Sequence, residues 1–483
     1  MTIPAEQREV ADFLTRLTGQ GIIETHISAV FLGAEEALKL KKAVKLTFLD
    51  FTRLSERERL VRFEQDLNHP MAPALYLGCE KITRGAGGAL RLGGEGEALE
   101  WVLRLRRLPP SSFLDHAEID PAWLDPMADA VAALHASAPR REGDGSLLRI
   151  ITENAEAGRA AELPEADVAL WKERILALHG TLAPWFAGRA RDGFLRRCHG
   201  DLHLGNLCLL DGRPTPFDAL EFDEAMATID TGYDLAFLLM DLERRAGRAA
   251  ANRVLNRYVA LTGDAALARG LPLWLSLRAF IRAHVAGKQK KPHVELLQAA
   301  LSYLEPAGPP RLIAIGGLQG TGKSVLARAI APGLGAAPGA LILRSDEIRK
   351  RRAGTSPETR LPAEAYAPEA SAAVFAELNR LALAALQGGQ DVIADAVFQR
   401  AGERQALEEL WPRFTGIWLQ APLAVLRARV AARRGDASDA DAAVLEAAAA
   451  RDPGPLAWHQ LDATSPPEVV ARKMLDLLAS SSP

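Results

Sequence analysis

Short apolar runs alternate with longer helical patterns through the C-terminal third of the chain. Five runs have the length of buried strands, namely residues 312–315, 340–343, 391–394, 416–419 and 458–461. Helical patterns separate them, and the alanine-rich run 440–450 also has the character of a helix. Strands that alternate with helices predict a doubly wound parallel α/β sheet.

The N-terminal part has another pattern, a small mixed region followed by a mostly helical one. A helix opens the chain, short strands are expected near 28–32 and 37–41, and a charged helix near 54–68. The glycine-rich stretch 85–96 indicates a hairpin turn region. Helical patterns follow Pro121, interrupted within 197–222 by two short apolar strands. We therefore expect a bilobal α+β domain.

A seam rich in proline and glycine, residues 304–310, separates the two patterns. It follows a helical run over 275–304 and precedes the first apolar strand of the C-terminal part. A chain of 483 residues is long enough for several domains of roughly 100–200 residues. We predict a division into residues 1–305 and 306–483.

Composition narrows the class of protein. The formal net charge of −3 argues against a strong nucleic-acid binder, and three sparse cysteines suit the reducing cytoplasm. The N-terminus lacks the pattern of a secretory signal, and no uncharged apolar stretch reaches the ~18 residues of a membrane span. The sequence leaves the oligomeric state open.

A glycine-rich motif with phosphate-binding spacing follows the first C-terminal strand. It runs from Gly317 through Gly320 and Gly322 to Lys323 and Ser324, and a helical pattern follows. In this context the backbone N–H groups cradle the phosphates of a nucleotide such as ATP, the lysine reaches the β/γ-phosphates, and the serine ligates Mg²⁺. The alternative is a chance glycine-rich turn.

Charged residues follow the next strands of the same part. Asp346 is placed to accept a proton from an attacking hydroxyl and Arg349 to hold an anionic substrate, with a helix N-cap as the structural alternative. Asp395 ends an apolar strand as a Walker B carboxylate does, and we expect it to hold Mg²⁺ directly or through water. Arg429 and Arg433 share a helix face and either close over nucleotide phosphates or form a solvated face.

Together these motifs resemble the P-loop kinases of small molecules and of polynucleotide 5′-ends, a group that includes chloramphenicol phosphotransferase and gluconate kinase. The resemblance covers roughly residues 311–480. It implies transfer of the ATP γ-phosphate to a hydroxyl with Asp346 as base, and it does not imply which acceptor is used.

A second motif lies upstream, where His199-Gly200-Asp201 is followed by Asn206 and, after a short apolar strand, by Asp218. One carboxylate to meet a hydroxyl, with an amide oxygen and another carboxylate to hold Mg²⁺, is what phosphoryl transfer requires. The alternative is a polar loop between strands.

This loop resembles that of the aminoglycoside phosphotransferase branch of the protein-kinase-like fold, which also includes choline and homoserine kinases. The resemblance implies that Asp201 is the catalytic base, that Asn206 and Asp218 are Mg²⁺ ligands, and that His199 supports the loop. It also implies a structural role for Asp230 and Asp234.

That family supplies a lysine from a small-lobe strand and a glutamate from the next helix. Lys39 and Lys41 lie on one side of the expected strand, so either suits the ATP-binding lysine, and Glu64 is the expected partner. No Gly-x-Gly-x-x-Gly motif precedes them.

The order of motifs resembles a bacterial two-domain family with the same fusion. We expect an ATP- and Mg²⁺-dependent phosphotransferase with two separate ATP sites, acting on hydroxyl groups of small molecules. One alternative is a polynucleotide 5′-hydroxyl kinase in the C-terminal domain. Another is a nucleotide-sensing P-loop domain that regulates the N-terminal kinase.

Overall fold

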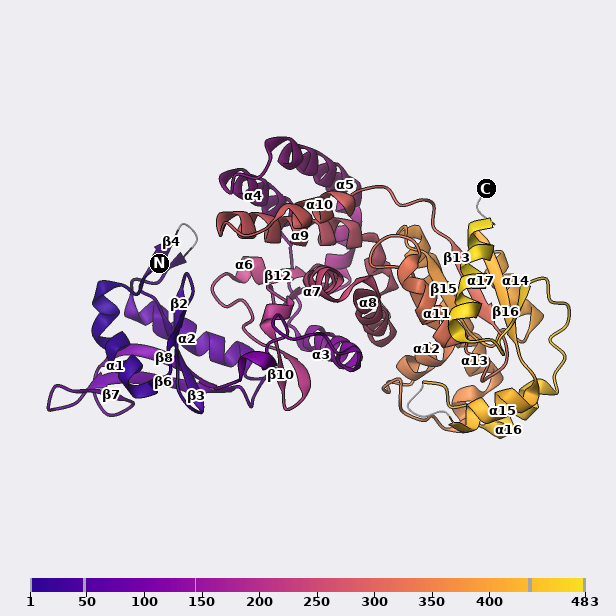
Figure 1. Cartoon of the computed structure of the whole chain (residues 1–483), viewed down its shortest axis with the longest axis horizontal. Coiled ribbons are helices and arrows are strands. Elements are labelled where there is room, and N and C mark those ends of the chain that lie inside the picture. Colours follow the sequence, from indigo (N-terminus) through magenta and orange to yellow (C-terminus); the bar gives the residue numbers. More distant parts are fainter. Residues whose placement is uncertain (1, 47–48, 144, 433–436, 481–483) are drawn as a thin grey trace. The chain divides into compact units, whose positions relative to one another are not determined.

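The computed structural model describes residues 2–46, 49–143, 145–432 and 437–480 (Figure 1). The chain divides into two compact units, Met1–Ser146 with Ala187–Asp234, and Leu147–Phe186 with Leu235–Pro483. The proline- and glycine-rich seam at 304–310 lies within the second unit. A domain division at residue 305 stays a prediction.

The first unit contains an antiparallel sheet of six strands in the order β1-β2-β3-β8-β6-β7. Its strands are β1 (Ile22–Glu24), β2 (Ser28–Leu32), β3 (Glu36–Lys41), β6 (Tyr76–Arg84), β7 (Leu90–Leu92) and β8 (Ala98–Arg106). Two further strands, β4 (Lys45–Leu46) and β5 (Leu49–Asp50), pair separately. Helix α1 (Arg8–Thr18) packs on the sheet, and α2 (Leu54–Asn68) contacts β6 and β8. The predicted helices and strands of this region are confirmed.

The alternation of side chains along β3 gives the sheet its two chemical faces. Leu38 and Leu40 join the buried cluster that includes Val10 and Leu14 of α1. Because successive side chains of a strand point to opposite faces, Lys39 and Lys41 are left to face the other way, where Glu64 of α2 meets them.

Short strands in the rest of the first unit frame the polar loop 199–206. Strand β9 (Leu195–Arg197) pairs with β12 (Thr228–Asp230), and β10 (Leu207–Leu210) pairs with β11 (Arg213–Pro216). The last two are the apolar strands expected within 197–222. Helices α3 (Leu124–Ser137) and α6 (Glu224–Ala227) complete this region.

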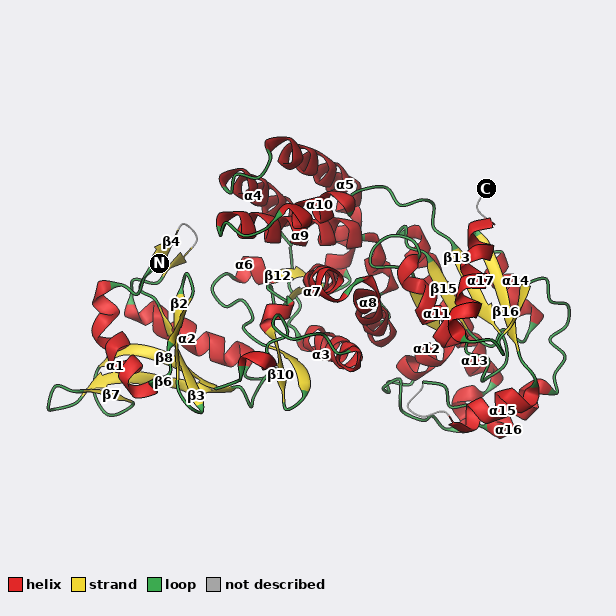
Figure 2. Ribbon diagram, viewed as in Figure 1, coloured by secondary structure: helices red, strands yellow, loops and turns green. Residues whose placement is uncertain are grey.

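Helices dominate the part of the second unit that precedes the seam (Figure 2). They are α4 (Leu147–Ala160), α8 (Arg248–Thr262), α9 (Leu271–Lys288) and α10 (Val294–Ser302), with most of α5 (Glu165–Arg191) and of α7 (Thr231–Ala246). The expectation of one continuous helical run over 275–304 was wrong. Lys290 has a φ of 56°, which is not helical. Pro292 in addition disfavours helical backbone in Lys291, the residue before it.

The C-terminal sheet has five parallel strands in the order β14-β15-β13-β16-β17. They are β13 (Leu312–Gly316), β14 (Leu341–Arg344), β15 (Val392–Asp395), β16 (Phe414–Gln420) and β17 (His459–Asp462). All five predicted strands are confirmed, with ends within two residues of the expected ones. The apolar runs were informative because strands buried on both faces need apolar residues at nearly every position.

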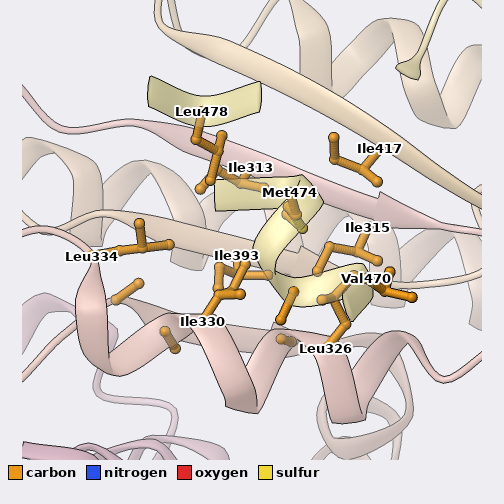
Figure 3. Packing of buried hydrophobic residues seen from close by; sticks show 14 of the residues in the cluster. Ile313, Ile315, Leu326, Ile330, Leu334, Ile393, Ile417, Val470, Met474 and Leu478 are labelled. Carbon is orange, nitrogen blue, oxygen red and sulfur yellow. The ribbon is translucent and has the colours of Figure 1, made fainter. Parts of the chain in front are cut away.

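Seven α-helices among the described residues accompany this sheet: α11 (Lys323–Ile330), α12 (Ser345–Arg352), α13 (Pro368–Gln387), α14 (Ala401–Glu408), α15 (Leu423–Ala432), α16 (Ala442–Ala449) and α17 (Pro467–Ser480). Figure 3 shows α11 and α17 side chains meeting the sheet in one apolar cluster, with Leu326, Ile330 and Met474 against Ile313, Ile315, Ile393 and Ile417. The doubly wound parallel α/β fold is thus confirmed. None of the helices in the described part of the chain is long and apolar enough to span a bilayer.

Candidate functional site

Lys39 lies at the centre of a charged cluster in the first unit. Its Nζ is 2.7 Å from Oε1 of Glu64 and 2.6 Å from Oδ1 of Asp218. Strand β3 presents the lysine, α2 presents the glutamate, and the segment after β11 presents the aspartate. Three residues far apart in sequence therefore meet where the sequence placed a nucleotide site.

Lys41 reaches the same glutamate from two positions further along β3. Its Nζ is 2.6 Å from Oε2 of Glu64 and also contacts the carboxylate of Glu221. The five side chains alternate in charge in the order Asp218, Lys39, Glu64, Lys41, Glu221. The chain of ion pairs ties β3 and α2 to the segment that carries Asp218.

Both lysines stay charged in this cluster. Burial by itself lowers the pKa of the Lys39 ammonium, but the carboxylates of Asp218 and Glu64 outweigh it and raise that pKa well above its usual value. Burial acts likewise on Lys41, whose pKa is raised by Glu221 and Glu64. The side chain of Lys41 is 1% exposed against 13% for Lys39. Lys39 is thus the more accessible cation.

The polar loop 199–206 is held in place by buried hydrogen bonds. Asp234 accepts the backbone N–H groups of His199 and Gly200 at 3.0 and 2.9 Å. His135, buried on α3, contacts the same carboxylate at 3.1 Å. Burial lowers the pKa of the His199 imidazole, and its Nε2–H donates to the Phe217 carbonyl. These bonds fix the backbone on which Asp201 stands.

Asp201 and Asn206 meet within the loop. The side-chain amide nitrogen of Asn206 donates to the Asp201 carbonyl at 2.9 Å and to its Oδ2 at 3.0 Å. The amide oxygen is left as the atom that can ligate a cation. Amide and carboxylate oxygens are the donors that Mg²⁺ takes, so Asn206 and Asp218 fit a magnesium ion chemically.

Asp218 sits in an unusual backbone conformation. Its φ is 59°, a region that non-glycine residues seldom adopt. The segment is held there because the Asp218 N–H donates to the Tyr76 hydroxyl at 2.9 Å and the Ala219 N–H donates to Oδ1 of Asn68 at 2.8 Å. Such restrained backbone is common where a side chain must be aimed.

The phosphate-binding motif of the second unit forms the turn between β13 and α11. Gly317, Gly320 and Gly322 have φ values of 132°, 85° and 87°. A Cβ at Gly317 would lie 2.4 Å from the Leu419 carbonyl oxygen, and one at Gly320 would lie 2.9 Å from that of Leu426. Glycine is therefore required for the turn and for its close approach to neighbouring backbone.

Polar side chains converge at the start of α11. Lys323 donates to the carbonyls of Gly317 and Leu318 at 2.8 and 3.0 Å, and Ser324 donates to Oδ2 of Asp395 at 2.5 Å. Asp395 ends β15, next to β13 in the sheet. The paired hydroxyl and carboxylate oxygens form a donor set of the kind that suits Mg²⁺.

Asp346 and Arg349 lie on α12, which follows β14. Burial raises the pKa of the Asp346 carboxyl, partly offset by the nearby charge of Arg344. The helix begins at Ser345 with Arg344 as its N-cap residue, so Asp346 is not the capping residue. Arg349 is 9% exposed. Both residues line a cavity of 1510 Å³ together with Lys323, Ser324, Asp395 and Arg429.

That volume exceeds the ~300–1,000 Å³ of a typical site for one small ligand. The cavity thus has room for a nucleotide beside a second molecule. Arg429 of α15 donates to the Ala463 carbonyl at 2.9 Å and to that of Gly320 at 3.4 Å, which places it beside the phosphate-binding turn. Arg433 lies outside the described residues.

Several polar residues at the two sites were not selected from the sequence. Arg344 is 5% exposed and pairs with Asp395 at 3.4 Å and with Glu347 at 2.9 Å. Glu221 and Tyr76 complete the cluster around Lys39 and Asp218. The one available signal was position, since Arg344 directly follows a predicted strand and Glu221 follows Asp218 by three residues.

Each half of the chain matches a known protein family. Residues 89–280 match the phosphotransferase enzyme family, and residues 312–454 match a family described as AAA domain. Among solved structures, a gluconokinase from Sinorhizobium meliloti is 23% identical, covering 36% of this chain and 93% of that one with a TM-score of 0.26. A choline/ethanolamine kinase family protein from Mesorhizobium loti is 12% identical, covering 62% and 93% with a TM-score of 0.35.

Two mycobacterial relatives extend over nearly the whole chain. The uncharacterized proteins Rv2004c of Mycobacterium tuberculosis and Mb2027c of Mycobacterium bovis are each 30% identical over 471 residues, covering 92% of this chain and 92% of the relative. In this chain an aminoglycoside phosphotransferase-like domain precedes a P-loop kinase domain. The chain is a phosphotransferase enzyme and belongs to the same family as these two proteins.

Proposed function

We propose that the chain carries two separate MgATP-dependent kinase sites, each of which phosphorylates a hydroxyl group of a small molecule. The observation that carries this proposal is that each unit holds its own set of phosphoryl-transfer side chains. Asp201, Asn206, Asp218 and Lys39 belong to the first unit, and Lys323, Ser324, Asp346 and Asp395 to the second.

In the first site Asp201 accepts the proton of the acceptor hydroxyl as the hydroxyl attacks the γ-phosphate. Lys39, oriented by Glu64, binds the phosphates of ATP, because it is the more exposed of the two lysines and lies against Asp218. Asn206 and Asp218 hold Mg²⁺, which supplies charge neutralisation on the phosphates. Lys41 stays buried with Glu221 and Glu64.

In the second site the backbone N–H groups of the turn 317–324 and Lys323 hold the β- and γ-phosphates. Ser324 and Asp395 hold the cation. Asp346 takes the proton of the acceptor hydroxyl, Arg349 holds an anionic group of the acceptor, and Arg429 lies over the phosphates. Asp346 is half-buried and lines the cavity together with Arg349. A domain that only senses nucleotide needs neither a base nor a cation for an acceptor, so the presence of both supports catalysis.

The experiment is a MgATP phosphorylation assay over aminoglycosides, sugars, amino alcohols, nucleosides and a 5′-hydroxyl oligonucleotide. It is run on the full chain and on the variants Asp201→Asn and Lys323→Ala. Asp211→Asn and Lys473→Ala are matched controls, because both residues are exposed. We expect each active-site variant to lose one product and keep the other, and both controls to keep both.

Each alternative gives a distinct result. Unchanged turnover in Asp201→Asn would refute the role given to the first site. Loss of all products in Lys323→Ala alone would favour a regulatory P-loop domain. Phosphorylation of the oligonucleotide and no small molecule in Asp201→Asn would assign a polynucleotide kinase to the second site.

A further inference from the structure

Asp439 gathers three hydrogen-bond donors on one carboxylate oxygen. Its Oδ2 accepts from Nζ of Lys350 at 2.5 Å, from the Tyr366 hydroxyl at 2.5 Å and from the Leu361 N–H at 2.9 Å. Asp439 lies in the described segment 437–441, which leads into α16 (Figure 1). Its donors come from α12 and from the loop between α12 and α13, here called the acceptor loop (residues 353–367). One side chain thus ties three parts of the P-loop site together.

The acceptor loop in turn holds Arg349. The Arg349 guanidinium carbon lies 4.7 Å from the centre of the Tyr366 ring, and Nη1 donates to the Ala365 carbonyl at 2.5 Å. Nη2 donates to Ser371 at 3.3 Å. Nε is buried and has no hydrogen-bond partner among the described residues. Arg349 lines the cavity, and its other contacts come from the acceptor loop and from Ser371 of α13.

The neighbour of Asp439 reaches the other acceptor-directed residue of α12. Ser438 lines the cavity together with Asp346. Burial raises the pKa of the Asp346 carboxyl, and Ser438 is a smaller influence that lowers it. The segment 437–441 therefore lies near Asp346 through Ser438 and reaches Arg349 indirectly through Asp439 and Tyr366. The two residues assigned to the acceptor share one support.

We propose that Asp439 is a positioning residue for the acceptor half of the P-loop site, holding the acceptor loop so that Arg349 and Asp346 are placed for catalysis. The inference rests on the kinase function proposed for that site. Asp439 acts through Tyr366, Leu361 and Lys350, and the nucleotide half of the cavity takes no support from it. Its loss should therefore change binding of the acceptor and leave binding of MgATP alone.

Fold stability alone is a weaker account of this arrangement. The Lys350 side chain is 1% exposed and that of Asp439 is 12% exposed, and a buried ion pair often gives no net stability over apolar residues. Such pairs are retained in some proteins because they fix one conformation. Here the conformation fixed is that of the loop under Arg349.

Asp476 of α17 offers a matched control. Its side chain is exposed and does not line the cavity. Asp476→Asn thus removes one negative charge from the second unit and leaves the acceptor loop and the contacts of Asp439 in place.

The test uses the full chain with Asp201→Asn, so that turnover reports the P-loop site alone. Asp439→Asn, Tyr366→Phe and Asp476→Asn are added singly, and kcat and KM are measured for MgATP and for the acceptor found in the assay above. We expect Asp439→Asn to raise the acceptor KM about tenfold or more, since small displacements of positioning groups are costly. Tyr366→Phe should act in the same direction, and Asp476→Asn should have no effect.

The KM for MgATP should stay within about twofold in all variants, because Asp439 supports the acceptor half of the site. A uniform loss of folded protein would differ from this result, since it would lower turnover without changing either KM. If Asp439→Asn does not fold, the acceptor KM of Tyr366→Phe tests the inference instead, since this variant keeps the Lys350–Asp439 ion pair. The inference would be overturned if folded Asp439→Asn or Tyr366→Phe kept the acceptor KM of the chain that carries Asp201→Asn alone. An equal rise in the KM for MgATP would overturn it as well. If the chain with Asp201→Asn alone showed no turnover, the proposed kinase function of the second site would fail, and the inference with it.

Discussion

Nζ of Lys39 lies 2.6 Å from Oδ1 of Asp218, although the two residues are 179 positions apart. The contact joins the candidate phosphate-binding lysine directly to a candidate metal ligand. Glu64, on the other side of the lysine, also binds Lys41. The arrangement assigns different tasks to two lysines that the sequence alone could not distinguish.

We expect Lys39→Met to lower kcat/KM of the first site by about 100-fold or more, in the range seen when a group that stabilises transferred charge is removed. Lys41→Met should have a smaller effect, because it alters only the support of Glu64. Lys323→Ala in the background silences the second site, and steady-state kinetics measures the difference. Equal losses in the two variants would contradict the assignment.

Asp201→Asn should lower kcat of the first site by about 10²–10⁴-fold, the usual contribution of a general base. The KM for ATP should be nearly unchanged, because asparagine keeps the shape of the side chain. Single-turnover kinetics separates this loss from slower product release. An unchanged rate of chemistry would show that another group accepts the proton.

Asp395→Asn should raise the Mg²⁺ concentration that gives half-maximal activity of the second site. The carboxylate lies 2.5 Å from the Ser324 hydroxyl, and replacing it by an amide removes the charged member of that pair. A magnesium titration of product formation in the Asp201→Asn background measures the shift. The first site, measured in Lys323→Ala, should keep its magnesium dependence when Asp395→Asn is added.

The second site should lose activity on acidification earlier than an ordinary carboxyl would dictate. Burial raises the pKa of Asp346, so the carboxyl is protonated at pH values where an exposed aspartate, with a pKa of about 3.9, is ionised. A protonated carboxyl cannot act as base, and log kcat/KM must therefore fall as the pH drops through the raised pKa. Ser438→Ala removes an influence that lowers this pKa, so it should move the acid limb to higher pH. No movement would argue against Asp346 as base.

Gly317→Ala should destabilise the second unit more than Gly322→Ala. Both glycines have positive φ, which costs other residues roughly 1–2 kcal/mol. Only Gly317 is also crowded, since its Cβ would meet the Leu419 carbonyl oxygen at 2.4 Å, whereas nothing lies within 4 Å of one at Gly322. Thermal unfolding without nucleotide, followed by circular dichroism, compares the two melting temperatures. Equal values would show that the turn relaxes away from β16.

Much of the C-terminal fold could be predicted from the sequence, because buried parallel strands are visible as local runs of apolar residues. Strands such as Leu312–Gly316 and Val392–Asp395 are runs of apolar residues, and the phosphate-binding turn has a fixed spacing. The helix break before α10 was also signalled, by Pro292, and was missed because the surrounding pattern is helical on both sides.

Contacts between distant segments left no such signal. Lys39 and Lys41 occupy equivalent positions on a strand, and only the place of Asp218 and Glu221 in space separates them. Asp439 belongs to no motif in the sequence, and its importance depends on Lys350 and Tyr366, which are 89 and 73 residues away. Motifs therefore identified the chemistry, and three-dimensional contacts identified the supporting residues.

The central claim, two ATP sites in one chain, is tested most directly by counting bound nucleotide. Isothermal titration of the full chain with a non-hydrolysable ATP analogue and Mg²⁺ should give two equivalents per chain. Lys39→Met and Lys323→Ala should each leave one equivalent, and the double variant none. A single equivalent in the unsubstituted chain, or loss of both equivalents through one substitution, would contradict the account.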